Sequence, residues 1–184
     1  MKLESTFLEP SAPMWKLEQQ HYSNGLSLIA GIDEAGRGAL AGPIAVAAVI
    51  LPLDWKPRAY RDSKTLSAQK RSQLALEIEA EALAWAVEFG SVREIDQYNV
   101  LHTTHRAAAR ALGRLAINPQ ALITDYLKLE TKLPILCPPK ADQTSYSVAA
   151  ASILAKTARD AYMLRLAEQH PEYGFKKHKG YGSS

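Results

Sequence analysis

The strongest constraint on the fold is a pair of apolar segments joined by a short glycine-rich stretch. Residues 26–32 are rich in Leu and Ile and are followed directly by Asp33 and Glu34, which predicts a buried strand that ends at the acidic pair. Residues 44–51 are dense in Val, Ile and Ala, follow a Gly-Pro pair and stop at Pro52, which predicts a second strand. Because the connection is tight, we expect the two strands to form a hairpin.

The rest of the chain alternates between helix-like and strand-like patterns. Amphipathic or Ala-rich periodicity predicts helices over residues 68–83, 101–115 and 145–168, and short apolar runs predict strands over residues 85–89, 121–124 and 133–137. In the second of these helices, Leu101, His105 and Ala108 begin a stripe with spacings of four and three, which is typical of a helix packed on a sheet. This order of elements predicts an α/β fold.

Length and composition favour one globular domain. The 184 residues are 47% hydrophobic and 22% charged, which suffices for one substantial core but not for two domains. We expect residues 25–184 to form that domain and residues 1–24, which mix charges with prolines, to be a loosely attached polar extension. No apolar run has the length of a signal peptide or of a membrane span, and Cys137 is the single cysteine, so we expect a cytoplasmic protein. The net charge of +3 is compatible with a polyanionic partner but does not identify one.

The most informative segment is Gly-Ile-Asp-Glu-Ala-Gly-Arg-Gly at residues 31–38. Its glycine spacing also matches the dinucleotide-binding fingerprint, but the segment beyond it has the pattern of a strand where that fingerprint requires a helix. Asp33 and Glu34 would also place two negative charges beside a pyrophosphate. A plain glycine turn with two solvated acids is the simplest alternative. Paired acids at the end of an apolar strand, beside glycines and Arg37, favour a site for metal and phosphate instead.

This octapeptide resembles the N-terminal signature of the ribonuclease HII family, the type 2 ribonucleases H. Further segments that resemble motifs of the family follow in the expected order: Asp62-Ser63-Lys64, Tyr98-Asn99-Val100-Leu101, Lys140-Ala141-Asp142, residues 147–156, Arg159-Asp160 and His178-Lys179-Gly180-Tyr181. The resemblance covers residues 28–182. It implies a ribonuclease H-like α/β fold, in which a mixed central sheet is flanked by helices on both faces.

The resemblance also implies an activity and a substrate. Members of the family are metal-dependent endonucleases, so the chain is expected to cut the RNA strand of RNA–DNA hybrids and to incise duplex DNA on the 5′ side of single ribonucleotides. Hydrolysis would leave a 3′-hydroxyl and a 5′-phosphate. We expect a monomer that binds nucleic acid and no membrane, with little preference for base sequence, because contacts to the phosphate backbone carry no sequence information.

Four carboxylates match the catalytic acids of the family, namely Asp33, Glu34, Asp125 and Asp142. Oxygen ligands suit Mn²⁺ or Mg²⁺, and two such ions can stabilise both the attacking water and the leaving oxygen of an in-line displacement. Without metal the cluster would repel itself, so we expect raised pKa values for some of these acids. Neighbouring side chains of a strand face opposite ways, so we expect Glu34 to lie past the strand end and to curl back toward Asp33.

Substrate recognition is expected to involve a loop and the tail of the chain. By resemblance, Gly36, Arg37 and Gly38 sense the 2′-hydroxyl of RNA, because glycines let the main chain approach the sugar and Arg37 can hold a phosphate. Tyr181 matches the family tyrosine that packs on the sugar beside the ribonucleotide. Lys64 is a candidate contact to a backbone phosphate.

The chain departs from the family pattern in two places. Tyr126 follows Asp125 where members often have glycine, and the chain stops at Ser184, short of the C-terminal tail that usually follows the Lys-Gly-Tyr motif. Two other classes stay open: a resolvase-like nuclease would use a similar acidic site on all-DNA junctions, and a non-catalytic module would bind hybrids without turnover. The complete acid set together with the Gly-Arg-Gly loop favours the ribonuclease. Arg159 and Asp160 are expected to have structural roles.

Overall fold

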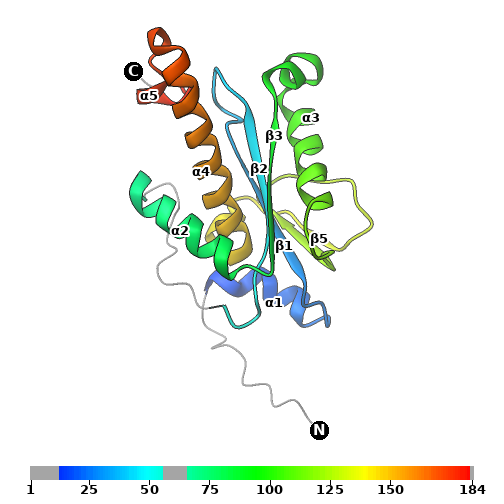
Figure 1. Cartoon of the computed structure of the whole chain (residues 1–184). Helices are drawn as coiled ribbons and strands as arrows, with labels where there is room; N and C mark the ends of the chain where they lie inside the picture. Colours follow the sequence, from blue (N-terminus) through cyan, green and yellow to red (C-terminus); the bar gives the residue numbers. More distant parts are fainter. Residues whose placement is uncertain (1–12, 56–65, 183–184) are drawn as a thin grey trace.

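A mixed five-stranded sheet forms the centre of the computed structural model, which describes residues 13–55 and 66–182 (Figure 1). The strands are β1 (Ile29–Ala35), β2 (Ile44–Ile50), β3 (Ala84–Gly90), β4 (Ala121–Thr124) and β5 (Ile135–Leu136), in the order β3-β2-β1-β4-β5. β1, β2 and β3 are antiparallel neighbours, whereas β4 and β5 run parallel to β1. The predicted hairpin of β1 and β2 is confirmed.

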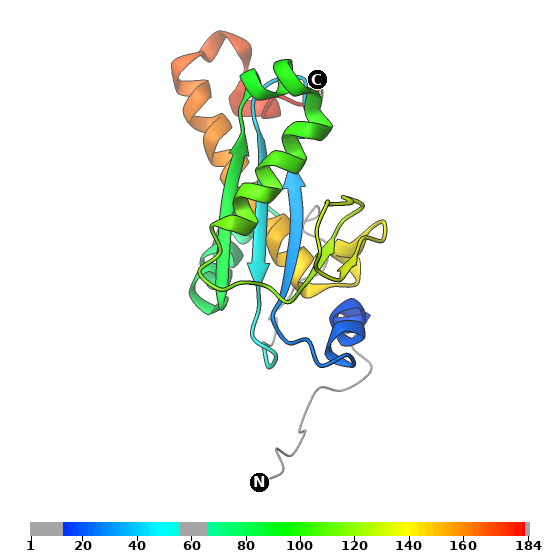
Figure 2. The same ribbon diagram turned by 90° about the vertical axis from the view of Figure 1, so that its right-hand side faces the viewer.

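Helices cover both faces of this sheet, as predicted. The α-helices are α1 (Lys16–Tyr22), α2 (Ala68–Glu81), α3 (Val92–Gly113), α4 (Tyr146–Gln169) and α5 (Phe175–His178), and the 3-10 turns are η1 (Pro13–Trp15), η2 (Ala141–Gln143) and η3 (Pro171–Tyr173). α2 and α4 share one core cluster with one face of the sheet, and α3 shares another with the opposite face. Figure 2 shows α3 crossing the strands on that opposite face. None of the described helices is long and apolar enough to cross a membrane.

Small residues let α4 lie directly against β1. A Cβ atom on Gly31 would come within 2.1 Å of the main-chain carbonyl carbon of Ser147, so only glycine fits between this strand and this helix. The alanine-rich start of α4 continues the close packing with Ala150 and Ala151, both of which are fully buried. The position of α4 relative to β1 is therefore fixed by backbone approach.

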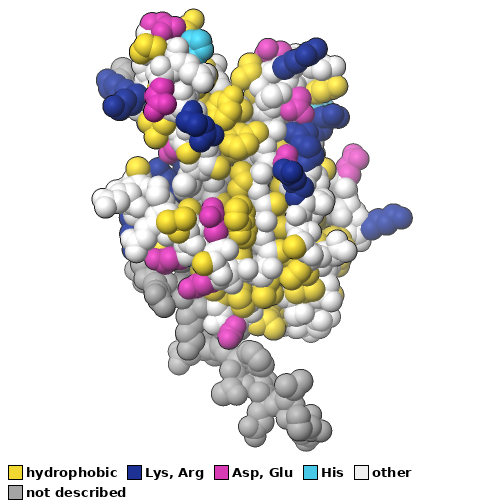
Figure 3. All heavy atoms as spheres, in the orientation of Figure 1, with side chains coloured by type: hydrophobic (Ala, Val, Ile, Leu, Met, Phe, Trp, Pro, Cys, Tyr) yellow, Lys and Arg dark blue, Asp and Glu magenta, His cyan; other side chains and the backbone are white. Residues whose placement is uncertain are grey.

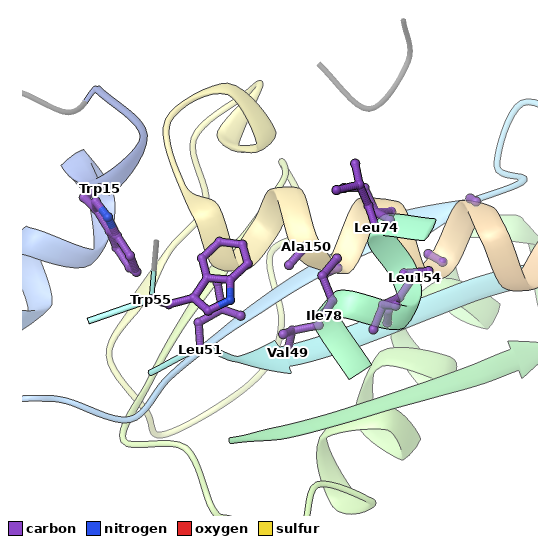
Figure 4. Packing of buried hydrophobic residues seen from close by; sticks show 14 residues of the cluster. Trp15, Val49, Leu51, Trp55, Leu74, Ile78, Ala150 and Leu154 are labelled. Atoms are coloured by element: carbon purple, nitrogen blue, oxygen red, sulfur yellow. The ribbon is translucent and has the colours of Figure 1, made fainter. Parts of the chain in front are cut away.

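An aromatic cluster closes the core at the N-terminal end of α4. Figure 4 labels eight side chains of this core: Trp15, Val49, Leu51, Trp55, Leu74, Ile78, Ala150 and Leu154. The Tyr146 ring lies edge-on to the rings of Trp15 and Trp55, with centroid separations of 5.0 and 5.8 Å. Because Trp15 belongs to η1, the cluster attaches the start of the described chain to α4.

The N-terminal segment is packed more firmly than the sequence predicts. Trp15, Leu17, Glu18 and His21 are all buried. For residues 13–24, the expectation of a loose attachment is therefore wrong, because one face of α1 is covered by the rest of the molecule. The division into residues 1–24 and a catalytic domain of residues 25–184 stays a proposal.

α3 begins earlier than its apolar stripe predicts. Ser91 and Glu94 form a capping box, so the helix starts at Val92. A kink follows at Asn99, whose φ of 65° is unusual for a residue other than glycine. The Asn99 side-chain oxygen accepts hydrogen bonds from the backbone N–H groups of Leu101 (3.0 Å) and His102 (3.1 Å). The predicted start at residue 101 therefore corresponds to the second half of the kinked helix.

Candidate active site

The acidic pair of β1 lies beside the end of β4. The last residue pair between these two parallel strands is Ile32 with Thr124, while β1 continues to Ala35 along β2. Asp125 follows β4, and its backbone N–H points at the Ile32 carbonyl oxygen, 3.4 Å away. Beyond that point the β4 side of β1 is no longer covered by a strand, which leaves room for a pocket.

One pocket of about 380 Å³ occupies this place and gathers most of the predicted site. Its lining residues are Asp33, Glu34, Ala35, Gly36, Arg37, Gly38, Arg71, Asp125, Ser152, Lys156 and Tyr181. The structure therefore brings together three of the four expected acids, the Gly-Arg-Gly loop and the tail tyrosine. Lys64 lies outside the described residues.

Asp33 and Glu34 reach the pocket in a different way from the one expected. Both belong to β1 and pair with Ala47 and Val46 of β2, so the strand does not end at the acids and Glu34 does not curl back. Their side chains alternate across the sheet, and both border the pocket because it lies at the uncovered edge of β1. The apolar pattern stops at residue 32, but the backbone hydrogen bonds of the hairpin do not require apolar side chains.

The environment of Asp33 favours its protonated form. The side chain is 8% exposed, and burial raises the pKa of its carboxyl well above the usual value, with the negative charge of Glu34 acting in the same direction. The negative charge of Asp125 raises the pKa of Asp33 further. Hydrogen bonds from the Ser152 side chain and from the Glu34 N–H lower this pKa, but they do not outweigh the effect of burial. The carboxylates of the pocket therefore repel one another, as the sequence predicts.

Asp125 and Asp142 are linked through the backbone. The Asp125 carboxylate accepts a hydrogen bond of 3.1 Å from the N–H of Ala141, the first residue of η2. Asp142, the next residue, is buried but does not line the pocket. Within residues 13–55 and 66–182, no group of three or more His, Cys, Asp or Glu side chains is arranged to hold a metal ion. The acids share one region without forming a complete coordination cage.

Two glycines of the loop differ in what the fold demands of them. Gly36 has a φ of +106°, and a Cβ atom there would lie 2.3 Å from Arg159 Nε and 2.8 Å from the Pro43 carbonyl oxygen. Gly38 has no heavy atom within 4 Å of its hypothetical Cβ position. The packing of the described residues therefore requires glycine at position 36 but not at position 38.

The tail that carries Tyr181 is bound to the loop after β1. The Gly180 carbonyl oxygen accepts hydrogen bonds from the N–H groups of Leu40 (2.8 Å) and Ala41 (3.2 Å). A Cβ atom on Gly180 would lie 2.2 Å from the Ala41 carbonyl oxygen, so the two segments touch through their backbones. The predicted recognition loop and the predicted recognition tyrosine therefore form one connected unit.

Arg159 holds this unit together, a role that the sequence does not reveal. Its side chain is 0% exposed and donates hydrogen bonds to the carbonyl oxygens of Pro43 (2.9 Å), Ala41 (3.0 Å) and Lys179 (2.9 Å). The expected structural role is consistent with these contacts. Asp160 instead forms ion pairs with side chains of α2 and α4.

α4 supplies pocket residues that the sequence analysis includes only within family-like segments, without a role at the site. Ser152, Lys156 and Arg159 are spaced by four and three, so they lie on one face of the helix, and the first two line the pocket. That spacing was the available signal, but the helix is rich in alanine on all sides and its pocket face is not distinguished by hydrophobicity.

Tyr126 occupies a backbone conformation that suits glycine. Its φ is +54°, in the left-handed region, and its side chain is exposed. A glycine, which the sequence resemblance leads one to expect at this position, would adopt the same conformation without steric cost. The Thr124 hydroxyl donates a 2.6 Å hydrogen bond to the Leu127 carbonyl oxygen and fixes the turn around this residue.

Basic side chains are concentrated toward one end of the visible surface. Figure 3 shows Lys and Arg gathered in the upper part of the face, over α3 and near the junction of α4 and α5. The C-terminal tail lies at the same end of the molecule (Figure 1). This placement is compatible with a polyanion that approaches from that end.

Comparison with known proteins agrees with the geometry. The sequence profile of the family described as Ribonuclease HII matches residues 30–184. A ribonuclease HII of Thermus thermophilus is 53% identical over 167 residues, which cover 91% of this chain and 81% of the relative. The ribonuclease H2 from Pyrococcus horikoshii OT3 superposes with a TM-score of 0.73 at 27% identity, covering 85% of this chain and 81% of that chain. RNase HII from Archaeoglobus fulgidus, solved as a complex with PCNA, gives 0.71 at 30% identity, covering 85% and 82%. The chain therefore belongs to the ribonuclease HII family and is a hydrolase of the ribonuclease H type.

Proposed function

We propose that this chain hydrolyses the RNA strand of RNA–DNA hybrids and incises duplex DNA on the 5′ side of single ribonucleotides, leaving a 3′-hydroxyl and a 5′-phosphate. One observation carries the proposal: three carboxylates, the Gly-Arg-Gly loop and Tyr181 line the same pocket. A resolvase acting on DNA would not need a loop that senses ribose, and a binding module would not need the acids. The combination supports a nuclease that recognises a ribonucleotide.

Gly38 supports recognition of the sugar by the main chain. The fold gives no steric reason for glycine at this position, because a Cβ atom would meet nothing within 4 Å. Gly38 nevertheless lines the pocket. We infer that the space is kept for substrate, so that a backbone group can approach a 2′-hydroxyl, which both donates and accepts hydrogen bonds.

The donors of the pocket fit hard divalent cations, Mn²⁺ or Mg²⁺. All its acidic groups are carboxylates, and among the described residues no thiol or imidazole lines it. We propose that two such ions are held by Asp33, Glu34 and Asp125, with Asp142 as the fourth ligand. When bound, the ions supply Lewis-acid activation of water and charge stabilisation at the leaving oxygen.

The protein's own side chains prepare the pocket for a phosphodiester. Ser152 hydrogen-bonds to Asp33 and holds its carboxylate in orientation. Arg37 Nη1 lies 2.9 Å from Glu34 Oε1, and the remaining N–H groups of a guanidinium can bind a phosphate oxygen. Lys64 remains a proposed phosphate contact. We also propose that the chain acts as a monomer in the cytoplasm.

A cleavage assay on defined duplexes tests the proposal. The substrates are a labelled DNA duplex with one ribonucleotide, a long RNA–DNA hybrid and an all-DNA duplex of the same sequence, each incubated with Mn²⁺, Mg²⁺ or EDTA. We expect one metal-dependent cut on the 5′ side of the ribonucleotide, cleavage of the hybrid, and an intact all-DNA duplex. Asp96→Asn, which neutralises an exposed carboxylate that does not line the pocket, serves as a matched control with wild-type activity.

Three results would contradict the proposal in different ways. Equal cleavage of the all-DNA duplex would assign the chain to the resolvase-like class. Binding of the hybrid without any metal-dependent product would make it a non-catalytic binding module. A cut on the 3′ side of the ribonucleotide would reject the proposed position of attack.

A further inference from the structure

Lys156 is held in the pocket by a network that the proposed mechanism does not use. Its Nζ lies 2.8 Å from Asp160 Oδ1, and its side chain is 30% exposed. The second carboxylate oxygen of Asp160 lies 2.9 Å from Arg71 Nη2 of α2. Asp160 is therefore fixed between two helices, and the ammonium that it binds has a defined position on the wall of the pocket.

The same ammonium lies over the ring of Tyr181. Lys156 Nζ is 4.7 Å from the ring centroid, and Arg159 Cζ is 4.8 Å from it. A cation over the face of an aromatic ring is attracted by the ring quadrupole at this distance. Because both cations come from one face of α4, the ring lies against that helix at the edge of the pocket.

The two cations have different tasks. Arg159 donates hydrogen bonds to the carbonyl oxygens of Pro43, Ala41 and Lys179. It therefore anchors the loop after β1 and the tail residue Lys179, which precedes the ring in sequence. Lys156 instead joins the ring to the carboxylate of Asp160. An ordinary ion pair between residues four apart on a helix would need neither the pocket nor the ring.

We propose that Lys156 is a specificity-determining positioning residue, which is tethered by Asp160 and holds the Tyr181 ring where it meets the sugar beside a ribonucleotide. The inference rests on the proposed function, incision beside single ribonucleotides, and on the expected contact of Tyr181 with the adjacent sugar. Preference for a single ribonucleotide over a long hybrid then depends on Lys156 through Tyr181. A long hybrid offers many equivalent registers and depends less on one ring orientation.

A double-mutant cycle tests this dependence. The variants are Lys156→Met, Tyr181→Leu and the combination of both, and the quantity measured is the ratio of kcat/KM on the single-ribonucleotide duplex to kcat/KM on the hybrid. Arg165→Met is the matched control, because Arg165 also lies on α4 over a tyrosine ring, 6.0 Å from the Tyr162 centroid, but does not line the pocket. Lys156→Arg tests rescue, since a guanidinium can make the same ring and carboxylate contacts.

We expect Lys156→Met to lower the ratio about three- to tenfold, which is the range that corresponds to a partly exposed cation–π contact. The double variant should show the same ratio as Tyr181→Leu alone, because the lysine acts only through the ring. Lys156→Arg and Arg165→Met should keep the wild-type ratio within about twofold. Thermal melting confirms that each variant is folded, and Lys156→Gln replaces the methionine variant if that protein does not fold.

The outcomes separate the inference from the function on which it rests. No incision at single ribonucleotides by the unaltered chain would overturn both. Normal incision together with an unchanged ratio in Lys156→Met would overturn the inference alone. The inference would also be overturned if the effects of Lys156→Met and Tyr181→Leu on the ratio multiplied in the double variant. The lysine would then act independently of the ring, for example by contacting the phosphate backbone directly.

Discussion

Glu18 of α1 is a buried carboxylate on which the stability of the whole N-terminal segment is expected to depend. It is 1% exposed and accepts hydrogen bonds from the Ser145 hydroxyl (2.7 Å), the Ser147 hydroxyl (2.6 Å) and the Ser147 N–H (3.0 Å). Glu18→Ala would leave these three donors without their acceptor and would open a cavity. At about 1 kcal/mol per lost bond, and with an added cavity cost, we expect a loss of about 3–4 kcal/mol in the free energy of unfolding.

Glu18→Gln separates shape from charge. Burial raises the pKa of the Glu18 carboxyl above its ordinary value of 4.5, and the hydrogen bonds from Ser145 and Ser147 only partly oppose the increase. The folded state therefore holds a proton that the unfolded chain releases near pH 4.5. The stabilising contribution of that proton is complete below this pH and is lost as pH rises toward the pKa of the folded state. Glutamine keeps an acceptor oxygen but has no such dependence.

Urea unfolding of the wild type and Glu18→Gln between pH 4.5 and about pH 8 measures this effect. The wild-type stability minus that of Glu18→Gln should fall as pH rises, with a limiting slope of about 1.4 kcal/mol per pH unit, and should level off above the folded-state pKa. Subtraction removes the other titrating groups. A difference that stays constant or increases with pH would refute the argument that burial controls this carboxyl, and a loss below about 1 kcal/mol for Glu18→Ala would refute the importance of its three bonds.

Three further substitutions test other parts of the structure. Asp33→Asn should reduce cleavage at least about a thousandfold while hybrid binding persists. It should also raise the melting temperature of the metal-free protein at neutral pH, because asparagine needs no proton to stay neutral at a site where burial and neighbouring carboxylates oppose ionisation; a lower melting temperature would contradict this argument. Gly31→Ala should lower the free energy of unfolding by about 3 kcal/mol, because its Cβ would overlap the backbone of Ser147. Gly113→Ala, where the Cβ meets nothing within 4 Å, should not destabilise the protein. Equal melting curves for the two variants would refute the close packing. Arg159→Met removes three hydrogen bonds, so it should lower the free energy of unfolding by about 3 kcal/mol and increase backbone hydrogen exchange in the tail. Unchanged exchange would show that Arg159 does not anchor the tail.

The sequence predicts those elements whose patterns are local. The strand over residues 121–124 and the helices that became α2 and α4 lie within two residues of their predicted bounds, because each carries its own periodicity and its own start signal. β1 was predicted to end too early. Asp33 and Glu34 face a pocket, so they interrupt the apolar pattern while the backbone pairing with β2 continues.

Residues that act across long sequence separations could not be found from local patterns. Arg159 donates hydrogen bonds to carbonyl oxygens more than a hundred positions earlier in the chain, and no residue spacing within α4 predicts these contacts. α1 has only seven residues, and Glu18 adds to its polar appearance although it is buried. Asp125 and Tyr181 were assigned by resemblance to the family, because a single acid after a short strand and a single tyrosine near a tail have no distinctive pattern of their own.

α4 connects the N-terminal segment to several parts of the candidate site. The first turn of α4 donates hydrogen bonds to Glu18 and lies against Gly31. Ser152, on the second turn, hydrogen-bonds to Asp33, and Arg159 in the middle of the helix anchors the loop and the tail. A displacement of α1 therefore acts on the same helix that orients an acid and the recognition tyrosine. Because packed interfaces resist gradual deformation, loss of the Glu18 contacts should shift α4 as a unit rather than locally. The described part of the N-terminal segment is thus packed against the helix that borders the candidate site.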